Sequence, residues 1–153
     1  MSTDTLTRDA TVLKLKRLLK APRERVFAAF TDQDKLTKWF GPKGVTIPEC
    51  DMDVRPGGRY RYVMQSEEDA SKRYIVCGEF KEIDPPARLV YSWAWETDGV
   101  LGHQSQVIIE LVDRDGATEL LLTHEKLESE ESRDSHGQGW TSSFDCLEIY
   151  LAT

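Results

Sequence analysis

The chain contains 153 residues, of which 39% are hydrophobic and 31% are charged, and its formal net charge is −7. That length is enough for one sizeable core and short for two ordinary domains. The acidic balance disfavours a nucleic-acid-binding protein, which usually presents a basic stripe. No apolar run resembles a secretory signal or approaches the ~20 residues of a transmembrane helix. We therefore expect a cytoplasmic protein that binds no nucleic acid and does not insert into a membrane.

Cysteines and histidines are too dispersed to suggest a disulfide framework or a metal site. The three cysteines, Cys50, Cys77 and Cys146, include no CxxC pair, and a scattered odd set is typical of reduced core residues. The histidines and cysteines together show no spacing typical of metal ligands. We expect neither a metal nor another cofactor.

Residues 1–10 are polar and are expected to form a flexible tail, with residues 11–153 forming a single domain. Apolar residues alternate with Lys and Arg from Val12 to Leu19, which predicts a first strand. Pro22 suits the first turn of a short helix, and Asp32 can cap a second one.

A two-residue periodicity begins after residue 43 and predicts a run of antiparallel strands. The Pro- and Gly-rich segment 55–58 is expected to form a tight turn, and Gly78 suggests a bulge or bend within a later strand. The alternation is clearest from Leu89 to Glu96, where large apolar residues occupy every second position. The expected strands cover residues 44–54, 59–65 and 74–83 and lie around residues 89–96, 107–111 and 120–124.

Helical spacing returns in the last segment. Ser129 can cap this helix, and Trp140, Phe144, Leu147 and Leu151 then form one apolar stripe along it. The inner face of the sheet is the one large apolar surface available to bury that stripe. The predicted fold class is therefore α+β: a curved antiparallel sheet of six to seven strands wrapped around a long C-terminal helix. Two short helices follow the first strand, and an apolar cavity is expected between sheet and helix.

Several short motifs occur in a characteristic order between about residues 12 and 151. Together they resemble the family of activator of heat-shock-protein-90 ATPase homologues. The motifs are Arg17 with Ala21-Pro22 and Val26-Phe27, then Asp53-x-Arg55-Pro56-Gly57-Gly58-Arg59-Tyr60, Gly78-Glu79-Phe80, Asp84-Pro85-Pro86-x-Arg88-Leu89-Val90-Tyr91-x-Trp93, His136-x-x-Gly139-Trp140 and Leu147-Glu148-x-Tyr150-Leu151.

This resemblance implies the helix-grip, START-like fold of the SRPBCC superfamily. Members of that superfamily bind lipids, hormones or polyketides, a few act on them, and the eukaryotic namesake stimulates a chaperone ATPase. We expect a lone domain here, without the separate N-terminal chaperone-binding domain of the namesake, which weakens the case for a chaperone role. Because fold does not imply function, the resemblance leaves the ligand or partner open.

Aromatic residues with polar groups dominate the set expected to face the helix. A core formed for packing alone would use more Leu, Ile and Phe, whereas buried Tyr, Trp and His need hydrogen-bond partners. The same residues could instead simply fill the core, and this alternative stays open. The candidates for contact with a hydrophobic small molecule are Tyr60, Tyr62, Met64, Tyr91, Trp93, Trp95, His124, Trp140 and Phe144.

Few residues suggest catalysis, and we expect no catalytic residue. His124 is the one candidate for proton transfer on the inner face, although a lone histidine is more often a hydrogen-bonded core residue. Neither paired carboxylates nor a serine-nucleophile motif is present. Arg17 could contact an anionic group of a ligand or pair with an acidic neighbour. Gly137 and Gly139 would allow either close packing on the sheet or a hinge beside the loop 97–103.

Three functions are therefore considered. The first is binding of an apolar or amphipathic small molecule between sheet and helix, without covalent chemistry. The second is a protein-interaction module that acts on a chaperone of the 90-kDa heat-shock class. The third is a small cyclase or hydrolase of a hydrophobic substrate that uses His124 with a tyrosine.

Overall fold

Alternating apolar and polar residues give nine strands among the residues that the computed structural model describes, which are 4–5 and 10–153. The strands are β1 (Asp4–Thr5), β2 (Leu13–Leu19), β3 (Val45–Met52), β4 (Arg59–Ser66), β5 (Arg73–Asp84), β6 (Arg88–Thr97), β7 (Val100–Leu101), β8 (Ser105–Arg114) and β9 (Ala117–Glu125). They form one antiparallel sheet in the order β1-β2-β9-β8-β6-β5-β4-β3, with β7 paired to β6. Of the expected tail, residues 1–3 and 6–9 lie outside the described part of the chain, and β1 pairs with β2.

The helices of the described part are α1 (Arg23–Thr31), α2 (Gln33–Leu36) and α3 (Glu130–Leu151). The side chain of Asp32 accepts a hydrogen bond from the Asp34 N–H at the start of α2. The side chain of Ser129 accepts one from the Ser132 N–H at the start of α3. Both predicted caps are therefore confirmed.

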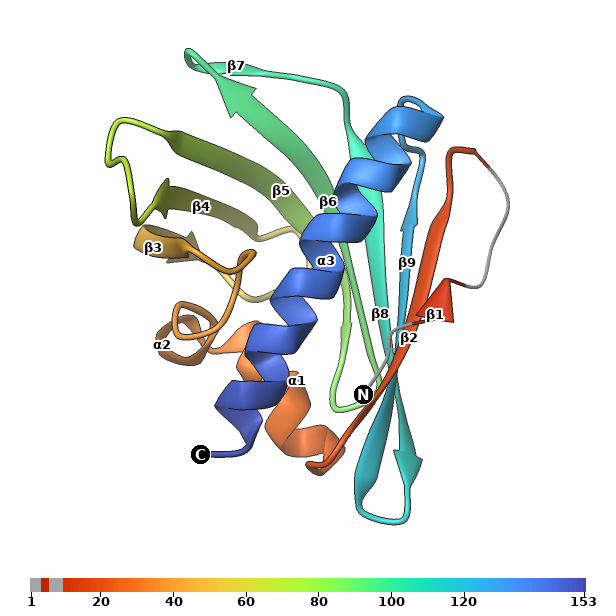
Figure 1. Cartoon of the computed structure of the whole chain (residues 1–153). Coiled ribbons are helices and arrows are strands. Elements are labelled where there is room, and N and C mark those ends of the chain that lie inside the picture. Colours follow the sequence, from red (N-terminus) through yellow and green to blue (C-terminus); the bar gives the residue numbers. More distant parts are fainter. Residues whose placement is uncertain (1–3, 6–9) are drawn as a thin grey trace.

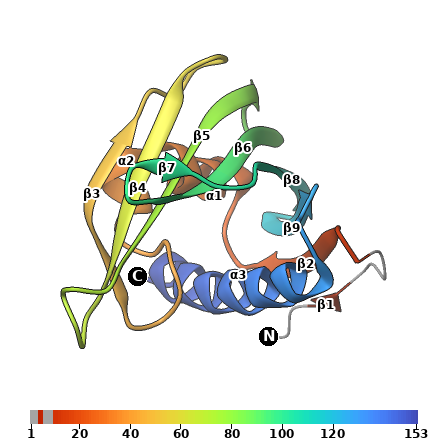
Figure 2. The ribbon, with the colours of Figure 1, turned by 90° about the horizontal axis from the view of Figure 1, so that it is seen from above.

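The long helix α3 lies across the concave face of the sheet, as the amphipathic pattern predicted (Figure 1). Seen from above, the sheet is strongly curved and α3 runs along its concave side (Figure 2). The short helices lie near the C-terminal end of α3, where the Arg25 guanidinium of α1 donates a hydrogen bond to the Leu151 carbonyl at 2.5 Å. The architecture is the α+β helix-grip, START-like fold, with two short helices after the first long strand.

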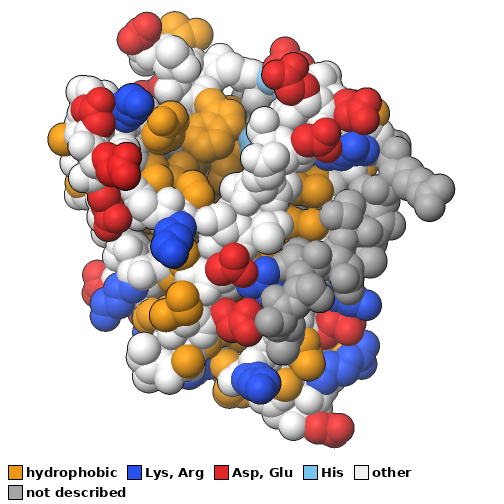
Figure 3. Space-filling model, in the orientation of Figure 1, with side chains coloured by type: hydrophobic (Ala, Val, Ile, Leu, Met, Phe, Trp, Pro, Cys, Tyr) orange, Lys and Arg blue, Asp and Glu red, His pale blue; other side chains and the backbone are white. Residues whose placement is uncertain are grey.

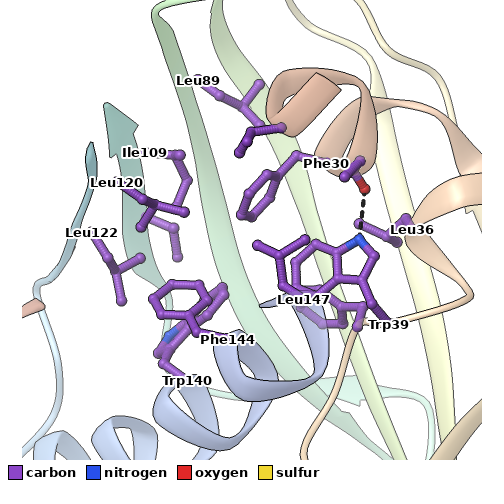
Figure 4. Close-up of a cluster of buried hydrophobic side chains, with 14 of the residues drawn as sticks. Phe30, Leu36, Trp39, Leu89, Ile109, Leu120, Leu122, Trp140, Phe144 and Leu147 are labelled. Atoms are coloured by element: carbon purple, nitrogen blue, oxygen red, sulfur yellow. Dashed lines mark hydrogen bonds between the residues drawn. The ribbon is translucent and has the colours of Figure 1, made fainter. Parts of the chain in front are cut away.

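The C-terminal half of α3 is packed tightly against the sheet. Phe144 and Leu147 are 0% exposed, and both point from α3 into a cluster of side chains from the sheet and the short helices (Figure 4). Burial of each such side chain contributes roughly 1.5–3 kcal/mol to folding. Trp39 joins the same cluster, and its indole N–H donates to the Ala29 carbonyl at 2.9 Å. The apolar stripe thus fixes where the helix sits.

Gly78 lies where the Tyr60 ring closely approaches the backbone of β5, and the bulge suggested at this residue is not found there. The irregularity in the pairing of β5 with β6 falls between Phe80 and Glu82. At Gly78, an added Cβ would lie 2.0 Å from the Ser92 carbonyl oxygen and 2.5 Å from the Tyr60 ring. The Tyr60 hydroxyl donates to that same carbonyl at 2.5 Å. The glycine therefore lets an aromatic ring cross the strand at van der Waals distance.

We predict that Gly78→Ala destabilises the fold by about 2 kcal/mol or more, because the new methyl overlaps backbone and ring atoms. Urea denaturation would measure the loss. The control is Gly102→Ala, where the nearest atom to an added Cβ is the Trp95 carbonyl oxygen at 3.5 Å. That variant should change the free energy of unfolding by less than about 0.5 kcal/mol. Equal stability of both variants would contradict the close contact at Gly78.

Candidate functional site

A cavity of about 210 Å³ lies between the N-terminal half of α3 and the sheet. In the space-filling view it is a hollow with an apolar surface in the upper half of the molecule, with charged side chains on the surface around it (Figure 3). The segment after α2, strands β4 and β6, and helix α3 all contribute to its lining. The lining residues are Phe40, Gly41, Pro42, Met64, Trp93, Trp95, Ser135, His136, Gly139, Trp140 and Ser143.

Small residues on one face of α3 leave this space open. Ser135, Gly139 and Ser143 recur at four-residue intervals, which places them on the same side of the helix. An added Cβ at Gly139 would meet no atom within 4 Å. The next turns of the helix carry Phe144 and Leu147, which fill the corresponding space farther along. The cavity therefore begins where large side chains on the inner face of α3 give way to small ones.

Four large aromatic side chains contribute to the cavity wall: Phe40, Trp93, Trp95 and Trp140. Trp93 packs against Trp140, with ring centroids 5.3 Å apart, and perpendicular to Trp95, at 5.6 Å. Phe40 stands edge-on to Trp140 at 5.8 Å. The segment that carries Phe40 is held to α3 by a 2.8 Å hydrogen bond from the Lys43 N–H to the Ser142 hydroxyl. Each ring is thus fixed by its neighbours before any ligand binds.

His136 stands at the cavity in one defined neutral form. The Trp95 indole N–H can only donate, and it donates to Nε2 of His136 at 3.1 Å. Nε2 is therefore unprotonated, and Nδ1 carries the hydrogen that it donates to the Ser132 carbonyl at 2.7 Å. This arrangement ties β6 to α3 beside the cavity.

His124 lies behind the cavity and is held in the opposite tautomer. Its Nδ1 accepts from the Trp140 indole N–H at 3.0 Å, so its Nε2 carries the hydrogen. Nε2 lies 2.7 Å from the Ser105 hydroxyl, which in turn donates to the Trp93 carbonyl at 3.3 Å. Because both nitrogens are engaged and the ring is 0% exposed, His124 has no free lone pair for proton abstraction.

Burial disfavours the charged form of both histidines. It lowers the pKa of His124 well below the usual value, and the nearby His136 lowers it further. Burial also lowers the pKa of His136, although its bond to the Ser132 carbonyl acts in the other direction. The two rings lie 4.9 Å apart, centroid to centroid. Both are therefore neutral at pH 7.

Four of the nine residues predicted to contact a ligand lie at the cavity: Met64, Trp93, Trp95 and Trp140. The other five lie in the surrounding core and are not among the residues that line it. These are Tyr60, Tyr62, Tyr91, His124 and Phe144. Burial raises the pKa of the three tyrosine hydroxyls, so they are neutral as well.

The remaining lining residues were not among the sequence candidates. The four-residue spacing of Ser135, Gly139 and Ser143 could have indicated a helix face of small residues. His136 is the neighbour of Ser135 in the sequence. The remaining three, Phe40, Gly41 and Pro42, reach the cavity through the fold of the segment after α2, which has no local signature.

Arg17 is placed between β2 and α3, away from the lining of the cavity. Its guanidinium Nη1 lies 2.7 Å from Oδ1 of Asp145 and 3.2 Å from Oε2 of Glu148. The Arg17 side chain is 1% exposed, whereas that of Asp145 is 60% exposed. This ion pair ties α3 to β2. Of the two expectations for Arg17, pairing with acidic neighbours is the one seen here.

Within residues 4–5 and 10–153, no group of three or more His, Cys, Asp or Glu side chains is placed to hold a metal ion. In the same part of the chain, no helix is both long and apolar enough to cross a membrane.

The sequence and the structure are both similar to those of one known protein family. The profile of the family described as Activator of Hsp90 ATPase homolog 1-like protein matches residues 20–152. The crystal structure of an AHSA1 protein from Silicibacter pomeroyi is 34% identical in sequence, with a TM-score of 0.84. That similarity covers 92% of this chain and 97% of the other. No curated protein matches the sequence.

Two further crystal structures show the same fold at lower identity. A protein from Nitrosomonas europaea is 26% identical with a TM-score of 0.79, and the similarity covers 95% of this chain and 97% of that protein. A protein from Chromobacterium violaceum is 25% identical with a TM-score of 0.82, covering 94% and 98%.

The neutral histidine pair predicts a pH dependence of stability. In the unfolded chain a histidine takes up a proton below about pH 6.5, whereas in the folded protein His124 and His136 resist it. The unfolded state then binds more protons, so the free energy of unfolding falls as the pH drops below about 6.5. The slope approaches about 1.4 kcal/mol per pH unit for each histidine until its lowered pKa is reached.

Urea unfolding between pH 7.5 and 5.5 would measure this slope. His136→Gln provides the comparison, because the amide oxygen can still accept the Trp95 N–H while one titrating group is lost. The free energy of unfolding of this variant should change with pH about half as steeply as that of the wild type, because one of the two buried histidines remains. A wild-type stability that is flat over this range, or an unchanged slope in the variant, would contradict the assignment.

Proposed function

The chain belongs to the family of Activator of Hsp90 ATPase homolog 1-like proteins, and on that premise we propose that it binds an apolar or amphipathic small molecule between α3 and the sheet. Family and fold support, in general terms, either a small-ligand-binding domain or a co-chaperone-like one. The observation that favours a ligand is the unfilled apolar cavity of about 210 Å³.

The cavity is better explained by a ligand than by the needs of folding. Larger apolar side chains at the small positions on α3 would fill it and would stabilise the fold by about 25 cal/mol per Å² of apolar surface removed from water. Instead, Gly139 lies inside a long helix, where glycine costs about 1 kcal/mol relative to alanine. Both choices reduce stability and both leave the space open. Ligand binding would explain why α3 carries these residues in spite of the stability that they cost.

The volume limits the part of a ligand that can be enclosed. Sites for drug-sized molecules usually measure ~300–1,000 Å³, which exceeds this cavity. A dry cavity of ~150 Å³ is known to hold benzene. A space of about 210 Å³ therefore suits a molecule, or the end of one, with about two fused rings.

The hydrogen bonds around His124 disfavour the enzymatic alternative. A general base needs a free lone pair within reach of the substrate. In this structure Nδ1 accepts from Trp140, and the Nε2 hydrogen points to Ser105. Ser105 is likewise not activated as a nucleophile, because it accepts from the imidazole instead of donating to it. We therefore propose binding without covalent chemistry.

A co-chaperone role is the second candidate, and the family description is the observation that favours it. Such a role would depend on surface side chains rather than on the cavity. The two functions can thus be separated by a variant that fills the cavity and leaves the surface unchanged.

We predict that Gly139→Leu weakens binding of a small apolar probe, because the new side chain occupies the space beside the helix. Binding of 1-fluoronaphthalene would be followed by ¹⁹F NMR on the full chain. The matched control is Gly139→Ala, since Ala and Leu have similar helix propensities. The alanine variant should gain up to about 1 kcal/mol of stability and bind within about threefold of the wild type. The leucine variant should bind at least about tenfold more weakly, losing roughly 1.4 kcal/mol.

Two results would contradict this proposal. One is that no saturable binding of the probe occurs in the wild type. The other is equal binding by both variants, which would place the probe elsewhere. If, in addition, the wild type and Gly139→Leu stimulate the ATPase of a 90-kDa-class chaperone equally, the co-chaperone function would replace the ligand-binding one.

A further inference from the structure

We infer that the cavity selects uncharged, planar aromatic molecules that carry a hydrogen-bond acceptor for the indole N–H of Trp93. This inference rests on the proposed function and narrows its ligand to one chemical class. Three properties of the site support it: the absence of charge in the lining, the arrangement of the rings, and one buried donor without a partner.

No described residue that lines the cavity has a charged side chain. His136 is the one lining residue that could become charged, and its ring is fixed as a neutral tautomer by Trp95 and Ser132. Protonation of Nε2 would set its new hydrogen against the Trp95 N–H and break that bond. An ionic group placed in this cavity would therefore lose its hydration without gaining a partner, which is strongly unfavourable.

The rings favour a flat occupant. Trp93 and Trp140 lie at an interplanar angle of 42°, while Trp95 is perpendicular to Trp93 and Phe40 is perpendicular to Trp140. These surfaces offer both ring faces and ring edges to a ligand. Aromatic pairs prefer offset-stacked or edge-to-face contacts, and either is available here to a two-ring molecule. An aliphatic chain of the same volume would gain burial but none of these contacts.

Among the described residues, the Trp93 indole N–H is a buried donor that lacks a hydrogen-bond partner. The indole N–H groups of Trp39, Trp95 and Trp140 each donate a hydrogen bond, to Ala29, His136 and His124 respectively. Among the described residues, by contrast, the nitrogen of Trp93 is a buried side-chain polar atom with no partner.

Leaving such a donor unpaired costs about 1–3 kcal/mol, and native proteins keep few of them. Because the same indole ring lines the cavity, an acceptor atom on a bound ligand would remove this cost. The nitrogen is closed off from solvent, so the ligand must displace a neighbouring side chain to reach it.

Four probes that share a frame of two fused aromatic rings separate charge from hydrogen bonding: naphthalene, quinoline, 2-naphthoate and N-methylquinolinium. Each would be titrated at pH 8 into the full-length ¹⁵N-labelled protein, and into Trp93→Phe. We expect the two charged probes to bind at least about tenfold more weakly than quinoline. The affinity ratio of quinoline to naphthalene should fall at least about fivefold in Trp93→Phe, the value of one hydrogen bond. This double comparison cancels the different hydration of the two probes.

A spectroscopic readout keeps the test independent of how well the variant folds. The chain has four tryptophans, so four indole N–H signals are expected, and the signal missing in Trp93→Phe identifies Trp93. In the wild type, quinoline should move the Trp93 proton downfield and naphthalene should not. Equal binding of a charged probe and quinoline would overturn the inference, as would a Trp93 signal that responds equally to quinoline and naphthalene. Failure of all four probes to bind would overturn the proposed function along with it.

Discussion

Burial of the apolar stripe of α3 is the constraint from which the rest of the structure follows. Phe144, Leu147 and Leu151 have no other apolar surface to cover them than the concave face of the sheet and the two short helices. Because α3 is one continuous helix, packing of this half also fixes the distance between its other half and the concave face of the sheet. The ion pair between Arg17 and the acidic residues of α3 holds the helix against β2. The position of the helix is therefore set by the packing of side chains that do not line the cavity.

This division of α3 explains how a stable fold can keep an open space. The large apolar residues of the stripe supply the burial, so the positions of Ser135, Gly139 and Ser143 can carry small side chains. The polar groups behind the cavity are satisfied internally, through the chain from Trp140 to His124 and Ser105. The walls are consequently rigid and uncharged. Such a site can discriminate between ligands by shape and by single hydrogen bonds, because its aromatic rings are held in place before a ligand binds.

The sequence was informative where a structural feature repeats locally. Alternation predicted the strands, and the caps at Asp32 and Ser129 were found because their side chains act within three residues. The cavity depended instead on which inward residues are large and which are small, and on the approach of the segment after α2 to the helix. That contact joins Lys43 to Ser142, 99 residues apart, and no periodicity predicts it. For the same reason aromatic residues such as Tyr62 and Phe144 could not be separated beforehand into core and lining.

The central claim is that the space beside Gly139 is open, apolar and accessible in the folded protein. A crystal structure under xenon pressure tests it most directly, because xenon enters dry apolar cavities without needing a specific partner. The account predicts a xenon peak bounded by Trp93, Trp140 and Gly139, close to the face of α3 that carries the small residues. A hollow filled by side chains, or one without xenon while the atom binds elsewhere in the molecule, would contradict it.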